Sequence, residues 1–293
     1  MSFPICDVTP DNFPPLLREI PQVPKQLNYR GNLPLTDMKL LAVVGSRKYS
    51  TYGKQVVDHL IAGLAGYNVG IVSGLALGID SLAHEAALAN TLYTVAVPGS
   101  GIDDKVIYPA SHRPLARKIL EAGGGLLSEF ESTFTATKWS FAQRNRIMAG
   151  MSHATLLIEA AEQSGTLITA RMASDYNREL LIVPGNIFSK NSQGVHQFLK
   201  LGATPVTSAE DILYALGINP EEAQQKQHVP NIPTSLSPEE QTILQTLSEP
   251  RDKDTLIRAS GLETHHANTL LMRMEMKGYI SEQNGIFYNK HNY

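Results

Sequence analysis

The chain has 293 residues, 42% of them hydrophobic, so it is long enough to bury a sizeable core in one large domain plus a small one. Its net charge is −3, from 25 basic and 28 acidic side chains. This balance excludes a protein that holds nucleic acid through bulk positive charge. Any anion must therefore be held by a local group of residues.

The single cysteine, Cys6, excludes an intrachain disulfide and a cysteine-based zinc site, and it favours a reduced, cytoplasmic location. The N-terminus has no basic stretch followed by an apolar core. No run approaches the ~18 consecutive apolar residues that a membrane span needs. We expect a protein that is neither exported nor membrane-bound, with no metal and no cofactor.

Residues 1–36 are dense in proline, which breaks long helices, so we expect an extended N-terminal segment laid across the next domain. After it, apolar runs of strand length alternate with segments of helix length, which is typical of βαβ units and a parallel sheet. The sequence thus predicts an α/β fold for 37–216, an extended Rossmann-like, doubly wound and mostly parallel sheet. The predicted strands lie at 40–44, 69–72, 92–97, 125–128, 154–158 and 179–183. The predicted helices lie at 53–65, 80–89, 111–123 and 164–177, with Asp80 as the N-cap of the second.

The stretch from Lys39 to Gly53 reads as an apolar strand, a glycine turn that carries Arg47, and a helix start. Such a turn presents free backbone N–H groups and the positive end of a helix dipole, which together suit a phosphate. Further turns follow other apolar runs in the same way. The residues that we expect in these phosphate-binding turns are Ser73, Gly74, Gly78, Gly99, Gly101, Ser164, Gly165 and Thr166.

Residues 217–236 have few apolar side chains and read as a linker. A second domain is predicted over 237–293, where a first helix is capped by Ser237 with Glu240 at the capping-box position. A second short helix and a third over 263–277 follow, the third with Leu270, Leu271 and Met274 on one face. A hairpin turning at Asn284-Gly285 completes a winged helix-turn-helix. This domain has 6 basic and 8 acidic side chains, so it is net acidic.

With these turns located, the chain resembles the DprA/Smf family of DNA-processing proteins over nearly its whole length. Six ordered blocks carry the resemblance: Gly45-Ser46-Arg47, SerGlyLeuAlaLeuGlyIleAsp with AlaHis (73–84), ProGlySerGlyIleAsp with TyrPro (98–109), PheAlaGlnArgAsnArgIleMetAlaGly (141–150), SerGlyThrLeuIleThrAla (164–170) and ValProGly (183–185). The family fold is an extended Rossmann domain, often with an N-terminal helical domain and a C-terminal winged helix. Because the Rossmann motifs begin so early here, we expect that N-terminal domain to be absent.

The resemblance implies sequence-independent binding of single-stranded DNA, homodimerisation, and loading of RecA during DNA uptake, natural transformation and recombination. It places Lys138 and Phe141 before the next helix and Arg144 and Arg146 within the ArgAsnArg motif. Cations neutralise phosphates and an aromatic ring stacks on any base, so the physics agrees. The implied DNA-binding residues are Gly45, Ser46, Arg47, Lys138, Phe141, Arg144, Asn145 and Arg146. The implied dimer surface lies near Phe198, Leu199 and Leu201. His196 departs from the family asparagine.

An alternative is a nucleotide-binding or nucleotide N-glycoside-hydrolysing protein, as in the related phosphoribohydrolase superfamily. Its signature glutamate is replaced here by Thr169, which cannot act as a carboxylate base. Asp80 and His84 lie four apart on a predicted helix, but local hydrogen bonding is favoured over acid–base work. Trp139 is expected to pack. We therefore predict no catalytic residues and a non-catalytic DNA-binding protein.

Overall fold

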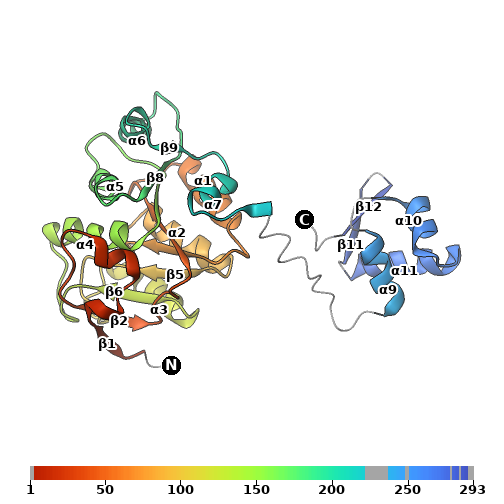
Figure 1. Ribbon diagram of the computed structural model, residues 1–293, viewed down its shortest axis with the longest axis horizontal. Coiled ribbons are helices and arrows are strands. Elements are labelled where there is room, and N and C mark those ends of the chain that lie inside the picture. Colours follow the sequence, from red (N-terminus) through yellow and green to blue (C-terminus); the bar gives the residue numbers. More distant parts are fainter. Residues whose placement is uncertain (1–2, 222–236, 248–250, 278, 284, 290–293) are drawn as a thin grey trace. The chain divides into compact units, whose positions relative to one another are not determined.

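The computed structural model describes residues 3–221, 237–247, 251–277, 279–283 and 285–289 (Figure 1). The chain divides into two compact units, Met1–Ala223 and Gln224–Tyr293. Most of the predicted linker, from 222 to 236, lies outside the described residues. The domain limits predicted from the sequence stay predictions.

The first unit is built on a nine-stranded sheet with the order β1-β2-β6-β5-β4-β3-β7-β8-β9. The strands from β6 to β9 in this order are parallel. They are β3 (Lys39–Val44), β4 (Val69–Ser73), β5 (Tyr93–Ala96), β6 (Gly125–Ser128), β7 (Ala154–Leu157), β8 (Glu179–Ile182) and β9 (Thr204–Pro205). The direction in which strands are added reverses between β3 and β7. The predicted doubly wound, mostly parallel fold is confirmed, and this reversal is its topological switch point.

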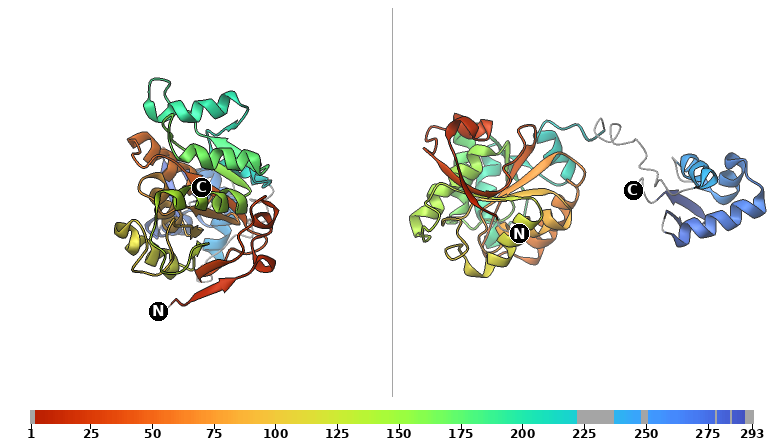
Figure 2. Two further views of the ribbon diagram at one scale, coloured as in Figure 1. Left: turned by 90° about the vertical axis from the view of Figure 1, so that its left-hand side faces the viewer. Right: turned by 90° about the horizontal axis from the view of Figure 1, so that it is seen from below.

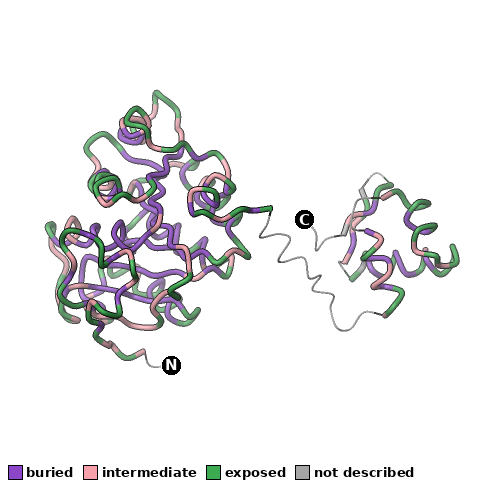
Figure 3. Tube along the Cα trace, viewed as in Figure 1, coloured by how far each residue is buried: buried purple, intermediate pink, exposed green. Residues whose placement is uncertain are grey.

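Helices cover both faces of the sheet (Figures 1 and 2). They are α1 (Thr51–Ala62), α2 (Ile79–Ala89), α3 (Arg113–Glu121), α4 (Lys138–Met151), α5 (Thr166–Asp175), α6 (Lys190–Lys200) and α7 (Ala209–Ala215). Alternate residues of β3 serve the two sides: Leu40 and Val44 pack with α4, α5 and α6, while Leu41 packs with α1, α2 and α7. Most residues of the strands from β3 to β8 are therefore buried (Figure 3), which explains their continuous apolar runs.

The N-terminal segment does more than lie across the domain. It contributes β1 (Ile5–Val8) and β2 (Leu27–Gly31) at the edge of the sheet, where β1 pairs antiparallel with β2 and β2 pairs antiparallel with β6. Two 3₁₀-helices, Pro10–Asn12 and Pro15–Glu19, join these strands. The prolines fall outside both strands, so they leave the ladder hydrogen bonds intact.

Several helix starts differ from the sequence predictions. Helix α1 begins at Thr51 because the Ser50 hydroxyl accepts a hydrogen bond from the Gly53 N–H at 3.1 Å. Helix α4 begins at Lys138, so Lys138 and Phe141 lie in its first turn and not before it. The predicted N-cap role of Asp80 is wrong. Gly78 is the N-cap of α2, because its φ of 89° sets the chain direction that enters the helix.

In its described residues, the second unit has three helices and a small sheet, as a winged helix does. Its elements are α9 (Pro238–Thr246), β10 (Arg251–Asp252), α10 (Lys253–Ser260), α11 (Thr264–Met276), β11 (Ile280–Gln283) and β12 (Ile286–Asn289). The predicted capping box of Ser237 with Glu240 is confirmed. Leu270, Leu271 and Met274 of α11 are buried as predicted. Gly285 has the positive φ expected of the hairpin turn, and Asn284 lies outside the described residues.

In the described part of the chain, no helix combines the length and the apolar character that crossing a bilayer requires.

Candidate functional site

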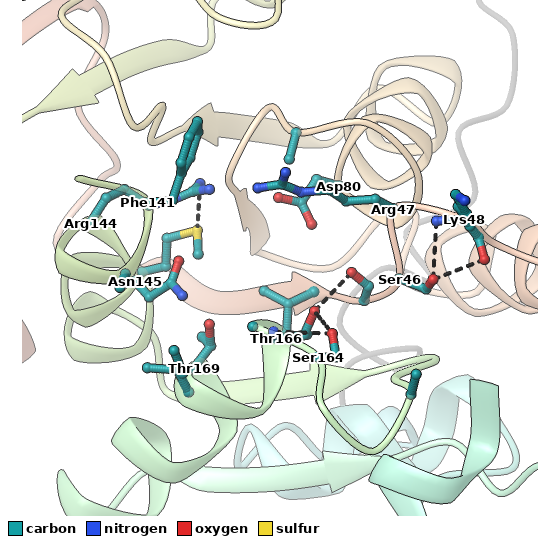
Figure 4. A pocket seen from close by; sticks show the side chains of 18 of the residues that line it. Ser46, Arg47, Lys48, Asp80, Phe141, Arg144, Asn145, Ser164, Thr166 and Thr169 are labelled. Carbon is teal, nitrogen blue, oxygen red and sulfur yellow. Dashed lines mark hydrogen bonds between the residues drawn. The ribbon is translucent and has the colours of Figure 1, made fainter. Parts of the chain in front are cut away.

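A cavity of about 800 Å³ opens at the carboxyl ends of the parallel strands, beside the switch point between β3 and β7. Figure 4 shows two facing walls: Arg47, Asp80, Phe141 and Arg144 on one side, Ser164, Thr166 and Thr169 on the other. Of the residues predicted for the site, those that line the cavity are Gly45, Ser46, Arg47, Lys138, Phe141, Arg144, Asn145, Ser164, Gly165 and Thr166. Open parallel sheets bind ligands at this position.

The turn that carries Arg47 is supported from behind by the start of α2. The Ile79 N–H donates to the Ser46 carbonyl at 3.1 Å. A Cβ at Gly78 would lie 2.6 Å from the Arg47 Cα, so only glycine permits this contact. The Arg47 backbone is thereby fixed at the end of β3 while its side chain lies along the cavity wall.

Phe141 lies between a glycine and a cation. A Cβ at Gly99 would lie 2.6 Å from Cδ1 of Phe141, so the ring packs directly on that backbone. The guanidinium carbon of Arg47 lies 5.1 Å from the ring centroid, within the range of a cation–π contact. Lys138, one turn before Phe141, also lines the cavity. A cation and an aromatic ring are thus held together in one wall.

Arg144 forms a buried part of the same wall, with 4% of its surface exposed. Its Nη1 donates to the Val97 carbonyl at 2.6 Å, and its guanidinium packs against Gly74. Burial lowers the pKa of Arg144 to about 10, and the carboxylate of Asp80 opposes that fall. Arg144 therefore stays charged at neutral pH and adds positive potential to the cavity.

The carboxylate of Asp80 accepts the Gly74 N–H at 3.2 Å. Burial raises the pKa of Asp80 above its ordinary value, and the Arg144 guanidinium opposes the rise. His84, the other half of the pair considered from the sequence, has its own partner: its Nδ1 lies 2.7 Å from Thr94 Oγ1. Each of the two side chains thus makes local hydrogen bonds.

The opposite wall is the first turn of α5. The Thr166 hydroxyl donates to the Gly45 carbonyl at 3.0 Å, which ties this turn to the end of β3. The Ser164 hydroxyl lies 3.0 Å from Thr166 Oγ1. Thr169, which lies where a nucleotide hydrolase carries glutamate, also lines the cavity. The wall therefore offers hydroxyl and backbone groups and no carboxylate.

Six of the predicted residues do not line the cavity. Arg146 lies two residues beyond Arg144 on α4, so it faces another way and pairs with Glu129 and the Gln22 carbonyl. The others are Ser73, Gly74, Gly78, Gly99 and Gly101, which lie outside the lining. Gly74, Gly78 and Gly99 serve by letting Arg144, Arg47 and Phe141 pack closely.

Some lining residues were missed as candidates from the sequence. They include Lys48, Tyr108, Ile168 and Asn191. Tyr108 belongs to the TyrPro pair of a recognised block, which was a usable signal. Asn191 had none, because its side chain reaches the turn after β3 only through the fold, where Nδ2 donates to the Lys48 carbonyl at 3.0 Å.

Two other sequence expectations concern residues outside the lining. His196 lies 3.1 Å, through Nε2, from the Gly185 carbonyl, so it makes a polar contact in place of the family asparagine. Trp139 packs edge-on against Phe130 and Phe134, with ring centroids 5.6 and 5.8 Å away, yet stays 54% exposed.

Within the described ranges, no three His, Cys, Asp or Glu side chains gather as a metal site would require.

The sheet and its switch point define a Rossmann-like protein. The glycine turn, the cations and the aromatic ring that line its cavity are groups that suit an anionic ligand. Residues 5–217 match the family described as DNA recombination-mediator protein A, and residues 227–285 match the DprA winged helix domain. The chain belongs to the DprA/Smf family, which confirms the resemblance seen in its sequence.

Two relatives illustrate the match. Protein Smf of Escherichia coli K12 is 35% identical over 92% of this chain and 72% of its own length. DNA processing protein DprA of Streptococcus pneumoniae R6 is 40% identical over 72% of this chain and 74% of its own length.

Two solved structures are similar to the first unit. That of DprA from Streptococcus pneumoniae has a TM-score of 0.67 at 39% identity and covers 73% of this chain and 74% of its own. That of DprA from Helicobacter pylori has a TM-score of 0.65 at 30% identity, with 73% of this chain and 96% of its own covered. The latter structure is described as revealing a single-stranded DNA binding mode.

Acid should destabilise the protein through His84. The side chain is fully buried, and burial lowers its pKa from 6.5 to about 3. As the pH falls, the His84 imidazole therefore gains a proton in the unfolded chain before it does so in the folded protein. The contribution of neutral His84 to folding stability is fully present above pH ~6.5 and declines below it. Between pH 7 and 5 this residue alone should cost about 2 kcal/mol.

The measurement is urea unfolding of the wild type and His84→Gln at both pH values. The variant should be less stable at pH 7, because Thr94 loses one of its two hydrogen-bond partners and keeps the Ile71 carbonyl. It should lose about 2 kcal/mol less than the wild type on going to pH 5. Equal losses would show that His84 does not titrate in this way.

Proposed function

We propose that the protein binds single-stranded DNA in the cavity at the switch point, largely without regard to sequence. The proposal rests on one observation above others: the Arg47 guanidinium lies 5.1 Å from the centre of the Phe141 ring, with Lys138 in the same wall. The Helicobacter pylori relative, described for its binding of single-stranded DNA, supports the same ligand here.

The chemistry of the wall suits this polymer. Arginine and lysine neutralise phosphates, and release of the counterions makes binding fall with salt. An aromatic ring stacks on any base, because every base has a π-face. A duplex keeps its bases paired and stacked, so it cannot offer them to Phe141. We therefore expect a strong preference for single strands.

The protein's role is proposed to be that of a mediator. It would hold an incoming single strand in the cytoplasm and help load RecA onto it during natural transformation and recombination, as its family membership implies. We also propose that it is not an enzyme. Asp80 is the carboxylate among the lining residues, and it is engaged by the Gly74 N–H and flanked by Arg144.

Replacing Arg47 by alanine should weaken binding to an oligothymidylate roughly tenfold, ~1.4 kcal/mol, with little loss of stability. The residue lies on a turn and supplies charge without burying core area. The salt slope should become shallower by about 0.7, the value for one phosphate contact to a single strand. Fluorescence anisotropy at several salt concentrations measures both quantities.

Lys25→Ala is the matched control, because Lys25 is exposed and does not line the cavity. It should leave affinity and slope unchanged. Unaltered affinity of the Arg47 variant at moderate salt would remove Arg47 from the site.

The proposed homodimer provides another prediction. Of the three residues expected at its surface, Phe198 and Leu199 pack into the core of the first unit, whereas Leu201 is 81% exposed. Leu201→Glu should split a dimer without unfolding the chain, because burying an unpaired charge at an interface costs several kcal/mol.

Sedimentation velocity at micromolar concentration measures this change, with Met272→Glu as the control at another exposed apolar residue. A wild-type chain that sediments as a monomer would end the dimer proposal. A dimer that survives Leu201→Glu would move the interface elsewhere.

The winged helix is proposed to contribute little to DNA affinity. The domain is net acidic, and its buried Glu240, which is 2% exposed, pairs with two of its cations. Oε1 of Glu240 accepts hydrogen bonds from both Arg273 at 3.1 Å and Lys277 at 3.3 Å. Arg273 lies in α11 and Lys277 is its C-cap, so one buried carboxylate engages both of these cations.

A truncated chain ending at Glu221, which keeps Ile218 packed on its core, should therefore retain most of the single-strand affinity. The comparison is made with the full chain on one oligonucleotide at two salt concentrations. A loss of tenfold or more, ~1.4 kcal/mol, from a truncated protein that is still folded and still has the full chain's oligomeric state would show that the winged helix binds DNA.

A further inference from the structure

A second aromatic ring, that of Tyr108, lies in the cavity wall beside Phe141. The two ring centroids are 5.7 Å apart and the ring planes are tilted by 56°. Tyr108 is 51% exposed, so about half of its surface remains open. Among the described residues, its hydroxyl has no hydrogen-bond partner. Tyr108 is thus neither a core residue nor a residue held by a polar contact.

Phe141 does not need Tyr108 for its own support. Its ring already rests on the Gly99 backbone and lies against the Arg47 guanidinium. An exposed ring in the wall of a cavity suits a flat ligand, because stacking removes apolar surface from water on both partners. For a strand that enters this cavity, the flat ligand is a base.

The spacing of the two rings indicates how two bases would use them. Stacked nucleotides in a regular strand rise by ~3.4 Å each. Rings 5.7 Å apart and steeply tilted cannot both serve one compact stack. They suit two neighbouring bases of a stretched, bent strand, each base on its own ring.

The segment that carries Tyr108 also offers cations for the next phosphates. Arg113 donates to the Lys105 carbonyl, so the two basic residues are held on one segment. In the part of the chain that the structure describes, neither side chain forms an ion pair. Of the two carboxylates on this segment, Asp103 accepts the Lys105 N–H and Asp104 pairs with Arg30.

We propose that the single-strand track continues out of the cavity over Tyr108, which stacks on the base next to the one at Phe141, while Lys105 and Arg113 attract the following phosphates. This inference rests on the proposed function, since it names a second base-binding position of the same site. Tyr108 is a binding residue here, not a support for Phe141.

The test is a scan with oligothymidylates that carry one 2-aminopurine, whose fluorescence is quenched on stacking, at successive positions from a fixed end. Wild type, Tyr108→Ala, Tyr108→Phe and Phe141→Ala are compared, with Tyr214→Ala as the control. Tyr214 is a matched residue because it is 58% exposed and lies outside the cavity lining.

Tyr108→Ala should bind roughly tenfold more weakly, within the range for loss of one stacked base. It should lose quenching at a position adjacent to the one lost in Phe141→Ala. Tyr108→Phe should behave as the wild type, because the ring and not the hydroxyl does the stacking. A double variant Lys105→Ala/Arg113→Ala should keep the quenching and show a shallower salt slope.

Loss of quenching at the same position in Tyr108→Ala and Phe141→Ala would mean that Tyr108 only supports Phe141, and would overturn the inference. So would wild-type affinity and quenching in Tyr108→Ala. A wild-type protein that binds no single strand at all would instead overturn the proposed function. Thermal melting of each variant separates these outcomes from unfolding.

Discussion

The site depends on close packing of side chains against backbone at the carboxyl edge of the sheet. Glycine at three points lets Arg47, Phe141 and Arg144 approach a neighbouring segment more closely than any side chain would allow. These contacts fix the side chains of Phe141 and Arg144, and the backbone of Arg47, relative to the strands. The cavity is therefore a consequence of missing Cβ atoms as much as of the polar groups that line it.

This packing also resolves an electrostatic problem. The chain as a whole is slightly acidic, with a net charge of −3, yet its proposed ligand is a polyanion. Positive charge is concentrated locally instead, with Arg47 and Lys138 in the wall and Arg144 buried behind them. Arg144 stays charged in spite of its burial, with a pKa of about 10, and the carboxylate of Asp80 opposes the lowering of that pKa by burial. In the winged helix, the buried carboxylate of Glu240 pairs with both Arg273 and Lys277.

Local sequence signals predicted much of the first unit. The parallel strands and the turn bearing Arg47 could be predicted because an apolar run followed by glycine is a pattern contained in a few consecutive residues. Strands β1 and β2 were missed because an antiparallel edge pairing is a long-range contact, and the prolines between them suggested only extended chain. Arg146 was grouped with Arg144 from a motif, although two residues on a helix so spaced cannot face the same side. The hydrogen bond from the Gly74 N–H to the Asp80 carboxylate joins a loop to a helix, so helix-capping rules could not predict it.

The central claim is that a local cationic and aromatic wall binds single strands in a protein with no overall positive charge. Its most direct test is a salt titration of wild-type binding to a single-stranded oligonucleotide and to a duplex of the same length. The account predicts clear preference for the single strand, with a salt slope of about −1.4 or steeper, as two or more phosphate contacts give. Equal affinity for the duplex, or single-strand binding that does not change with salt, would contradict it.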